Sequence, residues 1–191
     1  EMKSMYAKGD KKQIINFFNA VLVNDDFTLD ILYRKERYDS ASVISEYDEK
    51  TKTLLRNLND QKTDISILGA VEPFKLFSAD EKKINNTIEK INLTLRTYTG
   101  GYLRFENDGY MGGKNPWPIA TLWMYIYYKK IGATNEANEC LKFVIDTATP
   151  LGLLAEQIDN EQMKSKWVIG LGWSHAMFIL SLGLEELLNK N

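Results

Sequence analysis

The stretch GGYLRFENDGYMGGKNPW, at residues 100–117, decides how the chain folds, because it separates two helical patterns with a long connection rich in glycine, charge and aromatic rings. Two later stretches are of the same kind: TPLGLLAEQID at residues 149–159 and GWSHA at residues 172–176. Connections of this sort are where helical proteins place their binding residues. We therefore expect a helical scaffold whose functional side chains lie on these segments.

Helical periodicity surrounds the connections and predicts four helices, at residues 78–97, 117–131, 134–147 and 173–188. The first opens with a capping-box pattern, in which Ser78 caps the helix and Glu81 reaches back. Its apolar stripe is Ile84, Ile88, Ile91 and Leu95. The second helix is expected to bury one apolar face, formed by Ile119, Leu122, Trp123 and Ile126.

Other patterns precede these helices. Apolar residues near Ile14 predict an N-terminal helix, residues 64–71 predict a shorter one, and alternation predicts a small β-hairpin near residues 27–47. No linker divides the chain, so we expect a single domain over residues 1–191. Helices joined by long loops favour an all-α fold of the α/α-toroid type, a partial (α/α)6 barrel, over an ordinary bundle.

The composition excludes several classes of protein. The chain has 24 basic and 26 acidic residues, which leaves no electrostatic footprint for nucleic acid. Cys140 is the only cysteine and His175 the only histidine, so we expect no disulfide within the chain, no metal site and no cofactor. No stretch reaches the roughly 20 apolar residues of a membrane helix. No export signal is visible, which predicts a cytoplasmic protein, and Glu1 before Met2 suggests a processed or partial chain.

Glu156 is the candidate general base. It stands beside Gln157 in LLAEQID, directly after Pro150 and Gly152 have ended a helix. Apolar neighbours desolvate a carboxylate and make it a better proton acceptor, and Gln157 can orient it. The alternative is that Glu156 is a helix-capping or solvated residue.

Arg104, Asp108 and Tyr110 lie in YLRFENDGY, where alternation sends the arginine and the aspartate to one side of an extended loop. These two side chains can hold several hydroxyl groups of a sugar, because each presents paired donors or acceptors. The alternative is a surface salt bridge. Trp117 and Trp173 flank the loops and offer indole faces for a pyranose ring, although core packing is the default for a tryptophan.

His175 follows Ser174 at the start of the last predicted helix. A Ser–His nucleophile pair is not expected, because adjacent helical residues do not face each other and no G-x-S-x-G elbow is present. We expect His175 to be structural and to orient a site residue through a hydrogen bond.

At these residues the chain resembles the glucoamylase family, glycoside hydrolase family 15, in the C-terminal half of its catalytic barrel. The family patterns R-x-x-x-D-x-Y and G-x-N-P-W are matched by Arg104, Asp108, Tyr110, Gly113, Asn115, Pro116 and Trp117. The segments ATPLGLLAEQ and W-S-H are also similar, as is D-x-S-x-L at residues 64–68. The resemblance thus covers roughly residues 64–188.

This resemblance implies an inverting hydrolase that releases glucose from the non-reducing end of α-glucans or oligosaccharides. Glu156 would activate the water, while a second glutamate would protonate the leaving oxygen. Trehalose is an alternative substrate, since related sequences in the family act on it. The implied substrate-binding set is Arg104, Asp108, Tyr110, Trp117, Gln157 and Trp173.

The sequence departs from the family at the general acid, which lies in a W-E-E-like motif on an earlier helix. The upstream acids stand in other contexts: Glu36, Glu46, Glu49 and Glu72. We therefore expect the missing N-terminal half of the catalytic domain, or another chain, to complete this one. Two alternatives are a sugar-binding module or pseudoenzyme that lacks the acid, and a helical interaction scaffold, in which Arg104 and Glu156 would face separate surfaces.

Overall fold

The computed structural model of the chain describes residues 47–48, 50–56, 60–72 and 75–188. Contacts divide the chain into two compact units, Glu1–Ser45 and Glu46–Asn191, and the described residues belong to the second. The helix expected near Ile14 lies outside the described residues, as does the hairpin expected at residues 27–47 except for its last residue. The single domain over residues 1–191 stays a prediction.

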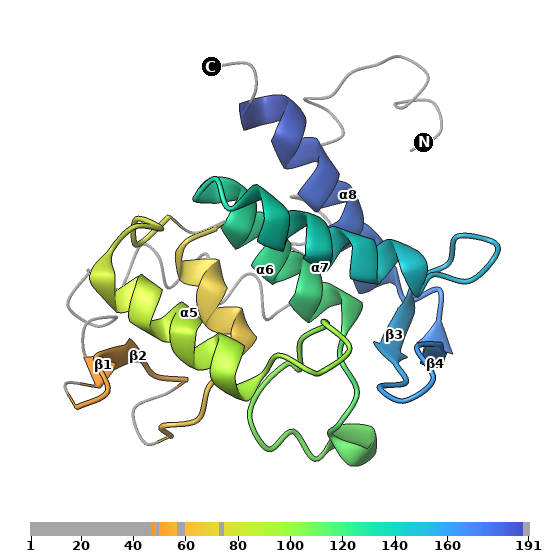
Figure 1. Cartoon of the computed structure of the whole chain (residues 1–191), viewed down its shortest axis with the longest axis horizontal. Helices are drawn as coiled ribbons and strands as arrows, with labels where there is room; N and C mark the ends of the chain where they lie inside the picture. Colours follow the sequence, from red (N-terminus) through yellow and green to blue (C-terminus); the bar gives the residue numbers. More distant parts are fainter. Residues whose placement is uncertain (1–46, 49, 57–59, 73–74, 189–191) are drawn as a thin grey trace. The chain divides into compact units, whose positions relative to one another are not determined.

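The described part is rich in helix and carries two small antiparallel hairpins (Figure 1). In chain order its elements are β1 (Tyr47–Asp48), β2 (Thr53–Leu54), the 3-10 helix η1 (Ile65–Ala70), α5 (Lys82–Thr94), the 3-10 turn η2 (Tyr110–Gly112), α6 (Pro118–Lys130), α7 (Thr134–Asp146), β3 (Ala155–Ile158), β4 (Ser165–Ile169) and α8 (Gly172–Leu188). The four predicted helices and the shorter one at η1 are confirmed. The described residues do not by themselves close a toroid.

The first predicted helix, α5, begins at Lys82 rather than at Ser78. Glu81 does accept a hydrogen bond from the Ser78 backbone N–H, at 2.7 Å, but the Ser78 hydroxyl turns to Asp80. The Ser78–Glu81 pair therefore closes a turn ahead of the helix, and the extended Glu81 becomes the N-cap. The predicted stripe is buried: Ile84, Ile88, Ile91 and Leu95.

Leu122 and Ile126 of the face predicted for α6 are buried, and so is nearly every other side of this helix. It begins with Pro118 in the first helical turn, where a proline costs no hydrogen bond. η1, α7, α8 and β3 all contact it. Its buried residues are Pro118, Ala120, Thr121, Leu122, Met124, Tyr125, Ile126, Tyr127 and Tyr128. α6 is thus the centre of the core, and Trp123 at its margin is only partly buried.

The packing of α7 reaches the segment that leads into α6. The ring of Phe143 lies so close to Gly101 that an added Cβ would be 2.4 Å from it and 2.7 Å from Pro116. Next to Gly101, Tyr102 accepts a hydrogen bond from the Trp117 N–H at 2.8 Å and donates its own N–H to the Thr121 hydroxyl at 3.0 Å. A residue without a side chain therefore lets α7, residue 101 and the start of α6 pack together.

The hairpin β3–β4 was not predicted, and it makes the fold a helical one with a small sheet rather than purely all-α. It joins α7 to α8 beside the core (Figure 1). Its turn is held by Asp159, which accepts hydrogen bonds from the backbone N–H groups of Glu161 and Gln162 and pairs with Lys166 at 2.7 Å. Among the described helices, none is long and apolar enough to cross a membrane.

Candidate active site

Glu156 lies in strand β3, not in a loop as the sequence suggested, and it is 9% exposed. The register of the hairpin shifts at this point: Ala155 pairs with Ile169 but Gln157 pairs with Lys166, so two β4 residues stand opposite Glu156. One of them, Trp167, has a φ of 62°. Such bulges bend a strand and re-aim its side chains, and they are common beside active sites.

Tyr110 links Glu156 to the glycine-rich loop. Its hydroxyl donates to Glu156 Oε1 at 3.3 Å, while Glu156 Oε2 is buried without a hydrogen-bond partner in the described part of the chain. The loop is tight, because Met111, Gly112 and Gly113 all have positive φ. A Cβ at Gly113 would lie 1.7 Å from the Asp108 carbonyl oxygen, so only glycine fits. The loop thus presents Tyr110 to the carboxylate.

Arg104 and Asp108 form a two-pronged ion pair next to Tyr110. Arg104 Nε donates to Asp108 Oδ2 at 2.8 Å and its Nη2 to Oδ1 at 3.0 Å. The buried Asp108 also accepts the Tyr110 N–H at 3.0 Å. The Arg104 guanidinium stacks over the Trp117 ring at 4.0 Å and lies 5.2 Å from the Tyr110 ring centre. Planar stacking and paired hydrogen bonds hold this arginine in one orientation.

Gln157 is anchored from the other loop and is almost fully buried. Asn115 donates its side-chain N–H to Gln157 Oε1 at 2.9 Å, and the Ile158 N–H donates to the Pro116 carbonyl at 2.9 Å. Gln157 Nε2 has no partner among the described residues. Each unpaired buried polar group costs about 1–3 kcal/mol, so two on successive residues are typical of a place where a ligand or another segment supplies the partner.

The first turn of α8 holds β3 from behind. The buried Ser174 hydroxyl donates to the Ala155 carbonyl at 2.8 Å, and His175 Nε2 accepts the Leu154 N–H at 3.1 Å. Because Nε2 accepts, Nδ1 carries the proton and donates to the Leu171 carbonyl at 2.9 Å. His175 is therefore a structural residue, as predicted, but its ring binds Leu154, directly before β3 and two positions before Glu156, and not one of the predicted site residues.

The structure brings most of the predicted residues into one cluster, which we call the Arg104–Glu156 cluster: Arg104, Asp108, Tyr110, Trp117, Glu156 and Gln157. Trp117 is 5% exposed, so it lies beneath Arg104 and Tyr110 and does not offer an open face to a sugar. Trp173 is 63% exposed in the first turn of α8, with no hydrogen bond or ring contact to the cluster in the described residues. Asn115 was part of the family pattern but was not predicted as a site residue.

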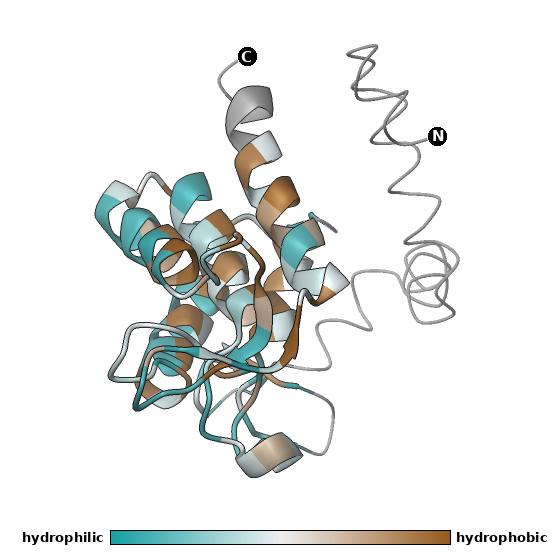
Figure 2. Ribbon diagram, turned by 90° about the vertical axis from the view of Figure 1, so that its right-hand side faces the viewer, coloured by the Kyte–Doolittle hydropathy of each residue, from teal (hydrophilic) through white to brown (hydrophobic). Residues whose placement is uncertain are grey.

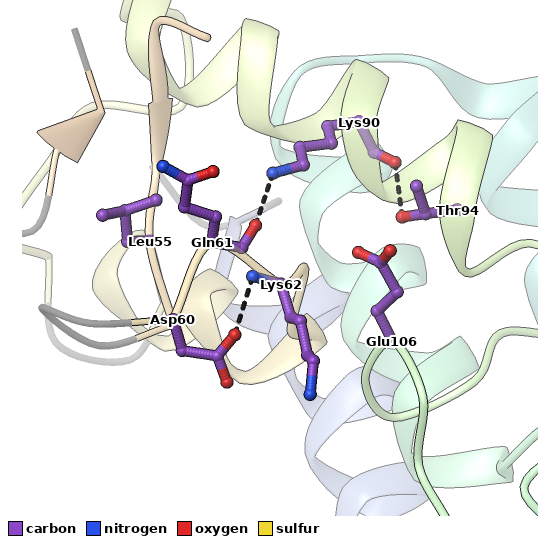
Figure 3. A pocket seen from close by; sticks show the side chains of 7 residues that line it. All are labelled: Leu55, Asp60, Gln61, Lys62, Lys90, Thr94 and Glu106. Carbon is purple, nitrogen blue, oxygen red and sulfur yellow. Dashed lines mark hydrogen bonds between the residues drawn. The ribbon is translucent and has the colours of Figure 1, made fainter. Parts of the chain in front are cut away.

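A separate hollow of about 690 Å³ lies elsewhere, and none of the predicted site residues lines it (Figure 3). Lys90 spans it and donates to the Gln61 carbonyl at 2.7 Å. The lining presents both polar and apolar surface and lacks an aromatic ring for a sugar: Leu55, Asp60, Gln61, Lys62, Lys90, Thr94 and Glu106. The described residues contain no group of three or more His, Cys, Asp or Glu side chains placed to hold a metal ion.

Comparison with known proteins gives relatives of one kind. The chain is 32% identical over 149 residues to an uncharacterized glycosyl hydrolase of Methanocaldococcus jannaschii, a match that covers 70% of this chain and 24% of that protein. It is 30% identical over 110 residues to trehalase 2 of Sulfolobus acidocaldarius, with coverage of 57% and 19%. The chain is a glycoside hydrolase homologue. No family model matches it.

Solved glycosidase structures share the fold of this chain. A wild-type glycosidase superposes with a TM-score of 0.68 at 23% identity, over 84% of this homologue and 46% of that chain. A bacterial glucoamylase complexed with acarbose superposes with a TM-score of 0.56 at 26% identity, over 64% and 20%. The resemblance to the glucoamylase family is thus confirmed. The homologue spans about a quarter or less of the length of the curated relatives it matches.

Proposed function

We propose that this chain supplies the base side of an inverting glycosidase site of the glucoamylase type, with Glu156 as the general base. One observation carries the proposal: Glu156 has one carboxylate oxygen bonded to Tyr110 and the other buried and unpartnered, within the Arg104–Glu156 cluster. The scaffold alternative required Arg104 and Glu156 to face separate surfaces. Tyr110 instead touches both of them.

The chemistry follows from the two oxygens. Glu156 Oε2 is free to accept a proton from a water molecule as that water attacks the anomeric carbon, while Tyr110 steadies Oε1. Inversion requires room for this water, with the general acid roughly 6.5–9.5 Å away on the opposite face of the sugar. Asp108 does not suit the role of that acid, because both of its oxygens are bonded to Arg104. The acid in this proposal comes from outside the described residues.

The sugar would be held by the polar groups that face the same cluster. Arg104 has a guanidinium N–H outside its two bonds to Asp108, and Gln157 Nε2 is an unused donor. Trp117 supports Arg104 from beneath, so its role would be indirect. The substrate class is a glucoside with an α-linked glucosyl end, either an α-glucan or trehalose. Trehalose is favoured by the trehalases among the relatives.

The test is release of glucose from maltooligosaccharides and from trehalose, resolved by anomer, for the chain alone and with the part of the Methanocaldococcus relative outside the matched 149 residues. Inversion predicts β-glucose from maltooligosaccharides. From α,α-trehalose it predicts one β-glucose from the attacked residue and one α-glucose from the leaving group, and we expect Glu156→Gln to abolish both reactions. Glu161→Gln is the matched control, because Glu161 is an exposed acid in the same hairpin. Activity that survives in Glu156→Gln, release of α-glucose from the non-reducing end of maltooligosaccharides, or release of two α-glucose molecules from trehalose would overturn the proposal. Sugar binding without turnover under every condition would favour the pseudoenzyme.

A further inference from the structure

The helix α8 is drawn largely in the hydrophobic colour (Figure 2), and several apolar side chains of α8 and of the strand β4 are exposed. We call these exposed side chains the α8 face. Residues 167–184 contain no Asp, Glu, Lys or Arg. Side chains from both elements contribute to it: Trp167, Val168, Ile169, Trp173, Ile179, Leu180 and Leu182. Exposed apolar side chains gathered in this number on two successive elements of a folded domain mark sites where another polypeptide or a membrane binds.

Helix α8 packs against the core through one side only, and its other sides remain exposed. Ser174 and Ser181, seven residues apart and therefore on one side of the helix, are both buried, and Met177 and Phe178 pack against the core on the same side. The exposed residues Ile179, Leu180 and Leu182 point in the other directions. A helix that is apolar all round is normally buried all round.

We propose that the α8 face is the docking surface for a helical polypeptide that supplies the rest of a glycosidase fold. This chain superposes on only 46% of the matched glycosidase while 84% of this chain is used, so more than half of that fold has no counterpart in it. Part of the α8 face also lies on the strand that pairs with β3, because Trp167 and Val168 are the two β4 residues opposite Glu156 in the hairpin.

This inference rests on the fold and on exposed surface, not on the chemistry proposed for Glu156. The two are separated by Glu156→Gln, which should keep the docking and lose the activity. If docking fails, the proposal that Glu156 is the general base is not contradicted. If Glu156→Gln keeps its activity, the proposal that the α8 face is a docking surface is not contradicted.

The experiment measures the affinity of the full chain for the part of the Methanocaldococcus relative outside its 149-residue match. We expect Ile179→Asp to weaken binding by roughly 30-fold or more, because docking would bury an unpaired carboxylate. Ile145→Asp on α7 is the matched control, since Ile145 and Ile179 are 54% and 51% exposed. We expect this control to bind as the wild-type chain does. No binding by the wild-type chain, or equal binding by Ile179→Asp, would overturn the proposal.

Three other results would replace the proposed occupant. Self-association of the wild-type chain that Ile179→Asp abolishes would make the occupant a second copy. Binding to phosphatidylcholine vesicles that Ile179→Asp abolishes would make it a membrane. Protection of an introduced thiol in Ile179→Cys in the monomeric chain, lost when residues 1–46 are removed, would make it residues 1–46 of this chain. In that last assay Cys140 stays silent at neutral pH, because burial raises the pKa of its thiol to about 12.

Discussion

Helices α6 and α8 have similar apolar sequences but different surroundings. α6 is enclosed by η1, α7, α8 and β3, whereas α8 touches the core through one side and leaves apolar side chains exposed on the others. The apolar composition of a helix therefore predicts that the helix is buried. It does not show whether residues of the same chain bury it. α6 has its partners within this chain, and α8 has only some of them.

The sharpest test of this comparison is truncation of one leucine in each helix. Leu122 in α6 is fully buried, so Leu122→Ala should lower the free energy of unfolding by about 2–5 kcal/mol. Leu180→Ala in α8 should cost much less, because 43% of that residue is already exposed. Urea unfolding followed by circular dichroism measures both. Equal losses would show that α8 is as enclosed as α6.

The loop that leads into α6 gives the next largest effect. Gly113→Ala forces a positive φ, which costs of order 1–3 kcal/mol for a non-glycine residue, and adds the overlap with the Asp108 carbonyl. Gly112→Ala has the positive φ with open space around the new Cβ, and Gly109→Ala has neither problem. Melting temperatures should therefore fall in the order Gly109→Ala, Gly112→Ala, Gly113→Ala, with the last lowest. A different order would contradict the geometry of the loop.

The first turn of α8 is the part of that helix that is well packed. Ser174→Ala removes a buried hydroxyl bonded to β3 and should cost about 1 kcal/mol. Ser181→Ala is the matched control, because that hydroxyl bonds back to Met177 within α8 itself, and such bonds add little. Hydrogen exchange at residues 154–157 should quicken in Ser174→Ala only. If both variants behave alike, α8 does not hold the strand.

The hairpin between the two helices should show a small acid dependence. Hydrogen bonding to Lys166, and then to the backbone of Gln162 and Glu161, lowers the pKa of Asp159 from 3.8 to about 2. Because the unfolded chain binds the proton more readily, this contribution is complete above the ordinary value and is lost as the pH falls through about 2. Asp159→Asn should therefore differ from wild type at pH 5 and match it near pH 2. A difference that is constant with pH would contradict this assignment.

The sequence predicted the elements whose signal is local and periodic. Buried Ile84, Ile88 and Ile91 repeat at helical spacing, and Pro150 and Gly152 mark the end of α7. The patterns around Arg104 and Glu156 also predicted that these two segments lie close together, and Tyr110 contacts both residues. These signals were sufficient because each lies within a few residues of the feature it predicts.

The errors came from features that depend on distant residues. The hairpin around Glu156 was missed because its pairing depends on a bulge at Trp167, a residue type that gives no sign of a positive φ. The extent to which α6 is buried was not predicted, because apolar periodicity indicates one buried face. The other sides of α6 are buried by α7 and α8, which the periodicity does not reveal. The burial of Trp117 follows from the stacking of Arg104, which spacing alone does not reveal.

The contact of Phe143 with Gly101 determines which substitutions distant from the candidate site can still change its geometry. Substitutions on the α7 side of the molecule that change the ring at position 143 would shift Pro116, and with it the peptide that bonds to β3 beside Gln157. The geometry of the candidate site is therefore inherited partly from a helix that contributes no side chain to it. Homologues that alter residue 143 and residue 101 together are the ones in which a reshaped site should be sought.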